Sequence, residues 1–355
     1  MSMQTYSLIP SRNLIRAEAE MLAHAVPIEV LARFGMTKEQ PTRKTDTVVF
    51  RRLNPYNMQT AATFAGGTST TVGGIPGITA ANFVLQEGVT PTPNTIAYTD
   101  VVGTLQQYGV LFRFSSKVEL MYEDDIPADM KILTGETLAE VGELIRYGVY
   151  KAGTSVQYAN GSSRSAVNTA ISINKLRLCL RQLEMARARR VNKMVGPSVK
   201  YFTQAVPAGF PVFIHTDVEA DVRALGLNVF IPVERYPAET RIHEREIGAV
   251  ENFRFITSPL LIPFLAAGSA TLGTCYSVGG ANVDVYPVII MGQDAWASVP
   301  LRGRGAVSPT ILPASMKNHA NPSGQFGYVG ADFWITVMRL NENWMVRLEV
   351  GVTQL

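Results

Sequence analysis

The sequence predicts an α+β protein, and two observations support this class. Residues 128–152 repeat apolar side chains at intervals of three to four residues, which is typical of a long helix, and residues 172–193 do the same. Segments rich in β-branched residues lie before and after these helices. Charged residues make up only 17% of the 355-residue chain, against about 25% in typical soluble domains, whereas hydrophobic residues make up 46%. We therefore expect much of the surface to lie against other protein.

Length and composition exclude several classes of protein. The length predicts about two domains. A formal net charge of +3 is too small for a dedicated DNA-binding domain. Two cysteines, Cys179 and Cys275, form neither a disulfide framework nor a CxxC zinc site. Residues 1–28 do not resemble a secretory signal, and the longest apolar run, 260–272, is shorter than the roughly 20 residues of a membrane span. We expect a soluble protein made in the cytoplasm.

The N-terminal region alternates charged and apolar residues. Residues 11–40 show helical spacing, which predicts a short amphipathic helix interrupted at Pro27. The β-branched run at 47–50 predicts a strand. This region is therefore expected to be an arm that leads into a strand.

A charge-poor stretch follows. Between Leu53 and Phe112 the only charged residues are Glu87 and Asp100, and Thr, Gly, Val and Pro are abundant. These residues predict extended strands joined by a long loop, with turns at its Gly and Pro clusters. An extended segment with so few charges is expected to lie on a partner. The alternative is a hairpin buried in this chain's own core.

The helix at 128–152 has clear boundaries. Pro127 suits the first turn, Asp129 complements the positive N-terminal end of the helix, and Lys151 complements the negative C-terminal end. Gly153 can end the helix. Its expected apolar stripe consists of Leu138, Val141, Ile145, Val149 and Ala152.

The helix at 172–193 carries the only concentrated basic patch. Seven cations lie on one face and Glu184 is the single acid; these cations are Lys175, Arg177, Arg181, Arg187, Arg189, Arg190 and Lys193. One interpretation is sequence-independent contact with phosphate. The other is a solvated face, or pairing with acids elsewhere, such as Glu123, Asp124 and Asp125.

The rest of the chain alternates short strands with one short helix. The predicted elements are strands at 211–214, 228–233, 253–257 and 285–291, a helix at 217–225 capped by Thr216 or Asp217, and a terminal hairpin of strands 333–340 and 344–350. A second charge-poor stretch runs from 258 to 301, where the only charges are Asp284 and Asp294. Its Gly-, Ser- and Thr-rich loop at 268–283 is a candidate contact in a ring of subunits, or an ordinary surface loop.

Motifs of catalysis are missing from the sequence. It has no GxSxG, phosphate-loop, GxGxxG or HExxH pattern. The adjacent Asp124 and Asp125 are expected to complement a helix end rather than to act as a catalytic pair. The histidines lack metal-ligand spacing; they are His24, His215, His243 and His319. We expect no catalytic, cofactor-binding or metal-binding residues and no enzyme; a hydrolase with an unrecognised site is the alternative.

Several stretches, taken in order, resemble the major capsid proteins of tailed bacteriophages. The resemblance is to the Hong Kong 97-type fold, in the branch that includes the schitovirus major capsid proteins. It covers nearly the whole chain from about residue 40, and it rests on TDTVVFRRLNPYN, LQEGVTPTPNTIAYTDVVGTLQQYGVLFRFSSKVE, VFIHTDVEADVRAL, IGAVENFRFITSP, VYPVIIMGQDAWASVPLRG and NPSGQFGYVGADFWITVMRLNENWMVRLEVG.

The resemblance implies a structural protein that assembles through pentamers and hexamers into an icosahedral shell around double-stranded DNA. It implies an N-terminal arm (1–52), an extended loop (53–115), a peripheral domain with a long spine helix (116–200 and 316–355) and an axial domain (201–315). Deleting residues 66–111 would then leave a folded core that forms no stable particles. An encapsulin-type cargo shell protein and a nucleic-acid-binding protein using residues 175–193 are the alternatives.

The resemblance also implies partners and a location. These are copies of the chain itself, a separate scaffolding protein, a portal and packaged DNA contacted non-specifically, with no membrane, in a virion capsid assembled in the bacterial host cytoplasm. The prototype of the fold cross-links its subunits through a lysine on the extended loop. Here no lysine lies between Lys44 and Lys117, so non-covalent contacts, or a cement or decoration protein, would have to stabilise the shell.

Overall fold

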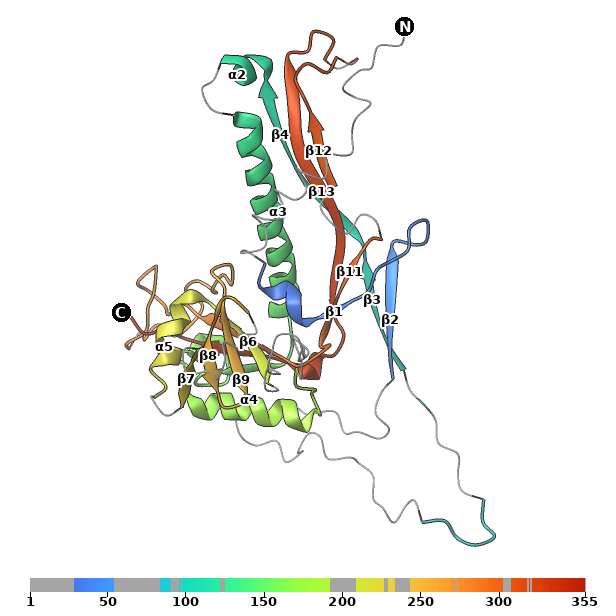
Figure 1. Cartoon of the computed structure of the whole chain (residues 1–355). Coiled ribbons are helices and arrows are strands. Elements are labelled where there is room, and N and C mark those ends of the chain that lie inside the picture. The colour runs from blue at the N-terminus through green and yellow to red at the C-terminus, as the bar shows by residue number, and fades with distance from the viewer. Residues whose placement is uncertain are drawn as a thin grey trace, which may run out of the picture.

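The computed structural model describes residues 29–53, 84–90, 96, 98–121, 125–191, 209–226, 229–233, 243–271, 273–302, 308–317, 319 and 321–354. These residues form helices and strands, which confirms the predicted α+β class. Figure 1 shows an elongated half built around one long helix, a globular half at its lower end, and a two-stranded ribbon to one side. The amphipathic helix expected within 11–28 and most of the expected long loop lie outside the described residues. Within the described part, no helix is long and apolar enough to cross a membrane.

The long helix α3 (Ile126–Lys151) forms as predicted. The Asp125 side chain accepts a hydrogen bond from the backbone N–H of Ala128 at 3.3 Å, Pro127 lies in the first turn, and Lys151 lies in the last. Of the expected apolar stripe, Leu138 is buried and Val141, Ile145 and Val149 are partly buried, but Ala152 was wrongly included, since it follows the helix and is exposed. A second buried face, which the stripe did not predict, carries Glu143, Arg146, Tyr147 and Tyr150.

One face of α3 packs on a five-stranded sheet. Its strands are β1 (Met36–Thr37), β11 (Trp296–Pro300), β13 (Phe326–Arg339) and β12 (Ser308–Leu312), with β4 (Gln106–Ser115) paired along the other edge of β13. β4 and β13 are antiparallel, from Gln106 opposite Ile335 to Ser115 opposite Phe326. Leu138 of α3 packs with Phe114 of β4 and Val329 of β13. The short helix α2 (Ser116–Met121) follows β4 at the upper end of this half (Figure 1).

The globular half surrounds a seven-stranded sheet. Its order is β5 (Val156–Tyr158), β14 (Met345–Val350), β10 (Tyr286–Met291), β6 (Phe210–Ile214), β9 (Phe253–Thr257), β8 (Glu246–Val250) and β7 (Phe230–Pro232). The helices α4 (Ile173–Met185) and α5 (Glu219–Arg223) bury Leu176, Leu183 and Val222 in the core of this sheet. The strands predicted at 211–214, 228–233, 253–257 and 285–291 are confirmed. The helix at 217–225 is confirmed too, but His215, rather than Thr216 or Asp217, accepts the capping hydrogen bond.

The predicted terminal hairpin is wrong. β13 pairs within the five-stranded sheet, whereas β14 pairs antiparallel with β10 and parallel with β5 in the other sheet. A 3-10 helix (Glu342–Trp344) turns the chain between them. The two terminal strands thus join the two halves. The seven-stranded sheet draws on residues from the ranges expected for both the peripheral and the axial domain.

The predicted basic helix at 172–193 is too long. α4 ends at Met185, and Arg187 adopts a left-handed backbone conformation with φ of 55°. Arg187, Arg189 and Arg190 therefore follow the helix rather than lie on its face. Residues 192–200 lie outside the described residues.

The ribbon consists of β2 (Thr47–Leu53) and β3 (Tyr98–Thr104), which confirms the strand predicted at 47–50. The two strands are antiparallel, from Thr47 opposite Thr104 to Leu53 opposite Tyr98. Only Leu105 separates β3 from β4, so the ribbon is continuous with the five-stranded sheet. Further 3-10 helices in the described part of the chain lie at Leu31–Phe34, Arg164–Ala166 and Thr216–Val218.

Candidate interaction surfaces

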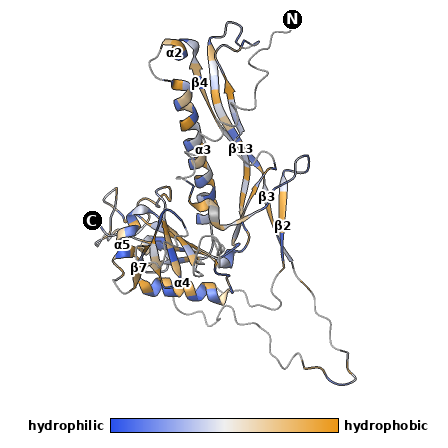
Figure 2. Cartoon of the chain, viewed as in Figure 1, coloured by the Kyte–Doolittle hydropathy of each residue, from blue (hydrophilic) through white to orange (hydrophobic). Residues whose placement is uncertain are grey.

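The two faces of the β2–β3 ribbon differ in burial. Val48, on the inner face, is 8% exposed and packs with Leu105, Val299 and Met338. The outer face carries two cross-strand apolar pairs, Val49–Val102 and Leu53–Tyr98. All four side chains are 53–59% exposed. Side chains alternate between the faces because successive residues of a strand point in opposite directions. Figure 2 shows hydrophobic residues along both strands of the ribbon.

A single ion pair lies between these apolar pairs on the described outer face. Arg51 is directly opposite Asp100 in the register, and its guanidinium donates hydrogen bonds of 2.8 and 2.9 Å to the two carboxylate oxygens. These hydrogen bonds hold the pKa of Asp100 below its usual value. Arg51 also lies 5.7 Å from the centre of the Tyr98 ring. The outer face of the ribbon, defined here as Val49, Arg51, Leu53, Tyr98, Asp100 and Val102, is therefore apolar with its only charges paired.

Beyond the ribbon, residues 84–90 lie far from the body of the protein (Figure 1). Their apolar side chains are among the most exposed of the described residues: Val84 is 72%, Leu85 74% and Val89 60% exposed. A turn at Glu87–Gly88, with Gly88 at φ of 77°, reverses the chain there. These exposures agree with the predicted extended excursion at 84–90, whereas residues 106–112 of the same charge-poor segment form part of β4 and pair with β13 in the chain's own sheet.

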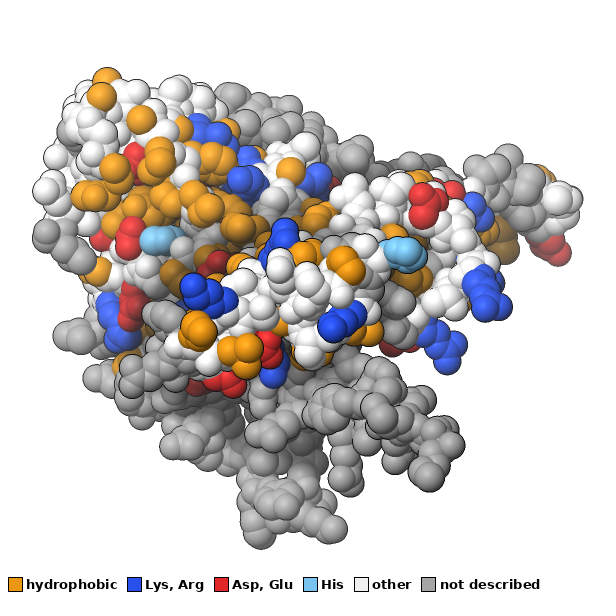
Figure 3. All heavy atoms as spheres, turned by 90° about the horizontal axis from the view of Figure 1, so that it is seen from above, with side chains coloured by type: hydrophobic (Ala, Val, Ile, Leu, Met, Phe, Trp, Pro, Cys, Tyr) orange, Lys and Arg blue, Asp and Glu red, His pale blue; other side chains and the backbone are white. Residues whose placement is uncertain are grey.

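The ends of the two halves expose further apolar residues. Leu120 and Met121 of α2 are 81% and 77% exposed. In the globular half the buried Asp284 carboxylate accepts backbone hydrogen bonds from Ala266 and Val278, at 2.6 and 2.7 Å. This carboxylate fixes a loop that exposes apolar side chains, namely Ile262, Leu265, Tyr276 and Val278. Figure 3 shows hydrophobic side chains gathered over this end of the molecule.

Two of the seven cations expected on the basic helix form ion pairs within the described part of the chain. Arg177 donates two hydrogen bonds to Glu251, and Arg190 pairs with Glu184. Of the acids suggested by the sequence, Asp125 caps α3, whereas Glu123 and Asp124 lie outside the described residues. Internal ion pairs therefore neutralise part of the positive charge on which the phosphate-binding interpretation depends.

The described residues offer little machinery for catalysis. They contain no group of three or more His, Cys, Asp or Glu that could hold a metal ion. Burial raises the pKa of the Cys179 thiol to about 12, so its nucleophilic thiolate is scarce at neutral pH. An open cleft of about 350 Å³ lies between β3, β4, α3 and β13, and Tyr108 is the only titratable residue among those lining it.

The chain is similar in sequence to a phage capsid protein. No family model matches the chain. The chain is 21% identical over 265 residues to the major capsid protein of Pseudomonas phage KPP21, a match that covers 70% of this chain and 66% of that protein.

Solved structures similar to this chain include phage capsids. The capsid of Ralstonia phage GP4 matches with a TM-score of 0.61 at 12% identity, covering 91% of this chain and 90% of that one. The capsid of cyanophage Pam1 matches with a TM-score of 0.55 at 11% identity, covering 94% and 93%. The head structure of Helicobacter pylori phage KHP40 matches with a TM-score of 0.53 at 11% identity, covering 99% and 95%. The chain has the fold of phage capsid proteins.

Proposed function

From this fold, we propose that the chain is the structural protein of an icosahedral phage capsid shell. Copies of the chain would assemble through pentamers and hexamers around double-stranded DNA. The observation that carries the proposal is the outer face of the ribbon, which is exposed and apolar in the single chain. The sequence relative and the structural neighbours are phage capsid proteins, which supports a shell protein over an enzyme.

The physics of a shell accounts for this surface. Interfaces that hold subunits permanently bury roughly 2,000 Å² or more and are depleted in charge. An extended ribbon enlarges the contact with a neighbour without requiring a larger core. On this proposal the outer face of the ribbon and residues 84–90 lie on a second copy. The apolar loop fixed by Asp284 meets other copies around a ring.

The finer assignment is to the Hong Kong 97-type fold, in the branch that includes the schitovirus capsid proteins. The order of elements and the resembling stretches support it. Residues 1–52 would be the N-terminal arm and 53–115 the extended loop. Residues 116–200 with 316–355 would be the peripheral domain, with α3 as its spine, and 201–315 the axial domain. In this scheme β5 and β14, from the peripheral ranges, are strands of the seven-stranded sheet, and α4 packs on that sheet.

The proposed partners follow from the same function. They are other copies of the chain, a scaffolding protein, a portal, packaged DNA contacted non-specifically and a cement or decoration protein, in a virion capsid assembled in the host cytoplasm. An encapsulin-type cargo shell has less support, because the sequence relative is a phage major capsid protein. A nucleic-acid-binding protein is less supported too, because Arg177 and Arg190 are paired internally.

Electron microscopy and sedimentation of the purified full-length chain test the proposal. The chain is expressed alone and together with the other head genes of its phage. Closed particles of uniform size, built mainly from this chain, are expected. A chain that stays monomeric under both conditions and is absent from virions would contradict the proposed function.

A further inference from the structure

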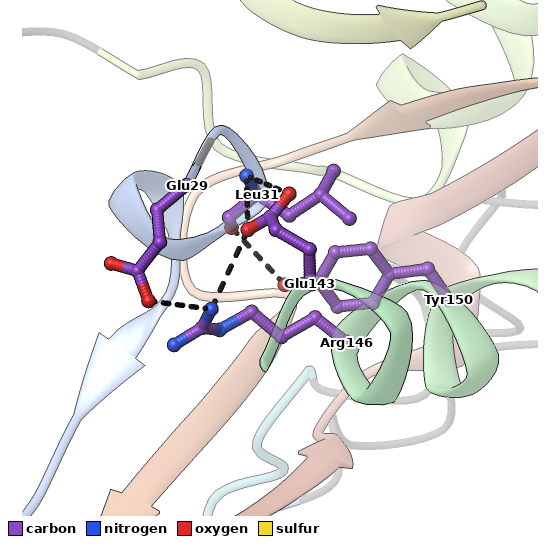
Figure 4. Close-up of polar contacts among 5 residues, drawn as sticks. All are labelled: Glu29, Leu31, Glu143, Arg146 and Tyr150. Atoms are coloured by element: carbon purple, nitrogen blue, oxygen red, sulfur yellow. Dashed lines mark hydrogen bonds and ion pairs between the residues drawn. The ribbon is translucent and has the colours of Figure 1, made fainter. Parts of the chain in front are cut away.

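The carboxylate of Glu143 is fully buried where the N-terminal segment meets α3. Both of its oxygens lie 3.1 Å from the backbone nitrogen of Leu31, which donates its hydrogen to them. Two turns further along α3, the hydroxyl of Tyr150 donates a hydrogen bond of 3.3 Å to the carbonyl of Leu31. Two side chains of α3 thus hold both backbone polar groups of one residue in the docked segment, residues 29–34 (Figure 4).

The charges at this junction do not balance. Among the described residues, Glu29 of the docked segment and Glu143 of α3 share a single cation: Nη1 of Arg146 lies 3.4 Å from an oxygen of each carboxylate. Exposure of the side chains is 0% for Glu143, 10% for Arg146 and 39% for Glu29. The hydroxyl of Tyr150, the remaining titratable group of the described junction, stays neutral because burial raises its pKa well above the usual value. With both carboxylates ionised, two negative charges of the described junction face one guanidinium, and one of them, on Glu143, is closed to water, which is unfavourable.

We propose that docking of residues 29–34 onto α3 is coupled to the uptake of one proton by Glu143, so that the segment is held more tightly as the pH falls. A proton on Glu143 leaves one carboxylate, Glu29, opposite one guanidinium, Arg146. An oxygen of the protonated group can still accept the N–H of Leu31. Ionisation restores the excess charge and weakens docking. This inference concerns the single chain and does not depend on the proposed function.

The direction of the pKa shift agrees with this coupling. Burial is the largest influence and raises the pKa of Glu143 from 4.5 to about 7, against the opposing effects of the Leu31 hydrogen bond and the Arg146 charge. An undocked segment would expose Glu143 to water and return its pKa toward the ordinary value. Docking then weakens by up to about tenfold per pH unit between 4.5 and about 7 and levels off above that range.

Apolar contacts keep the segment near α3 at every pH. Leu31 and Phe34 are buried, and the Phe34 ring lies 5.4 Å from that of Phe213. Gly35 packs directly on Trp296, since a Cβ at this position would fall 2.3 Å from the indole ring. Ionisation of Glu143 is therefore expected to loosen the segment locally rather than to unfold the chain.

Hydrogen exchange of the Leu31 amide in the full-length, unassembled chain measures this docking. Protection factors, corrected for the intrinsic rate at each pH, are followed from pH 5 to pH 8. In the wild-type chain we expect protection to fall by up to about tenfold per pH unit up to about pH 7. Glu143→Gln, which resembles the protonated form, should keep high protection throughout. Glu140→Gln is the matched control, because Glu140 is an exposed acid on the same helix; it should behave as the wild type does.

Glu29→Gln provides a second test, which holds even if Glu143→Gln fails to fold. Removing the Glu29 charge should lower the pKa of Glu143, so that the loss of protection moves to lower pH. Protection in the wild-type chain that does not change between pH 5 and pH 7 would overturn the proposal. So would a pH dependence that survives in Glu143→Gln, or one that Glu29→Gln leaves in place.

Discussion

Arg51 and Asp100 face each other across the β2–β3 ribbon, joined by two hydrogen bonds of 2.8 and 2.9 Å, in the middle of an otherwise apolar exposed face. In the single chain this pair is exposed to water, and such pairs contribute little to stability. Under a second copy of the chain it would lose its water, and each charge would depend on the other. The pair is therefore expected to matter for assembly rather than for folding.

The first prediction separates these two roles. Asp100→Asn should leave the melting temperature of the subunit nearly unchanged, because Arg51 can still reach water there. The same substitution should strongly reduce particle yield, because an unpaired guanidinium would be buried at each contact. The charge-swapped double variant, Arg51→Asp with Asp100→Arg, should recover part of the yield. Normal assembly of Asp100→Asn, measured by sedimentation, would argue that this face stays in water.

The second prediction concerns a charge introduced on the outer face of the ribbon. Val102→Glu should block assembly while the subunit stays folded, because Val102 is 59% exposed in the single chain and would be buried in the shell. Asn174→Glu, which adds the same charge at an exposed position of α4, is the control and should assemble normally. Circular dichroism reports folding, and electron microscopy reports particles. Equal assembly of the two variants would contradict the assignment.

The third prediction concerns the charge-poor excursion. The sequence suggests that residues 66–111 can be deleted without loss of the core, but the structure contradicts this. That deletion would remove β3 and half of β4, whose Tyr108 and Val110 pack against the core. Replacing residues 54–97 with Asn-Gly is the sharper experiment, because Leu53 and Tyr98 are directly opposite and a two-residue turn can join them. The shortened chain should fold and remain unassembled; particles as stable as those of the wild type would disprove a role for the excursion.

The fourth prediction is that alanine at two glycine positions changes the free energy of unfolding in opposite directions. A Cβ on Gly148 of α3 would meet nothing within 4 Å, so Gly148→Ala should raise the free energy of unfolding by about 0.5–1 kcal/mol through better helix propensity. A Cβ on Gly330 of β13 would fall 2.5 Å from the carbonyl oxygen of Val110 on β4. Gly330→Ala should therefore lower the free energy of unfolding by about 1–3 kcal/mol. Urea unfolding of the unassembled subunits measures both, and equal effects would contradict the packing of β4 on β13.

Local signals predict the elements better than the pairing between them. The sequence around Pro127 and Asp129 was enough to place α3, because a helix end depends on nearby residues. The turn at Asn341–Asn343 resembled a hairpin, yet β14 pairs with β10, far away in the sequence. Burial decides this pairing, since Val346, Leu348 and Val350 complete the core of the seven-stranded sheet. The early end of α4 had no local signal either, because Arg187 adopts a left-handed conformation that its residue type does not favour.

The charge deficit located the candidate surface, but the buried charges could not be predicted. Alternation of Val49, Arg51 and Leu53 in a charge-poor region indicates one exposed face of a strand. Nothing in the local sequence distinguishes Glu143, which is fully buried, from the exposed Glu140 one turn earlier. That difference arises because the N-terminal segment, more than 100 residues away in the sequence, covers one of these residues and not the other.

A reconstruction of the assembled particle by electron cryomicroscopy tests the central claim most directly. The quantity to measure is the exposed fraction of Val49, Leu53, Tyr98 and Val102, each more than half exposed in the single chain. We predict that these side chains are buried against a neighbouring copy, with Arg51 and Asp100 still paired between them. A particle in which the outer face of the ribbon remains open to water would contradict the account.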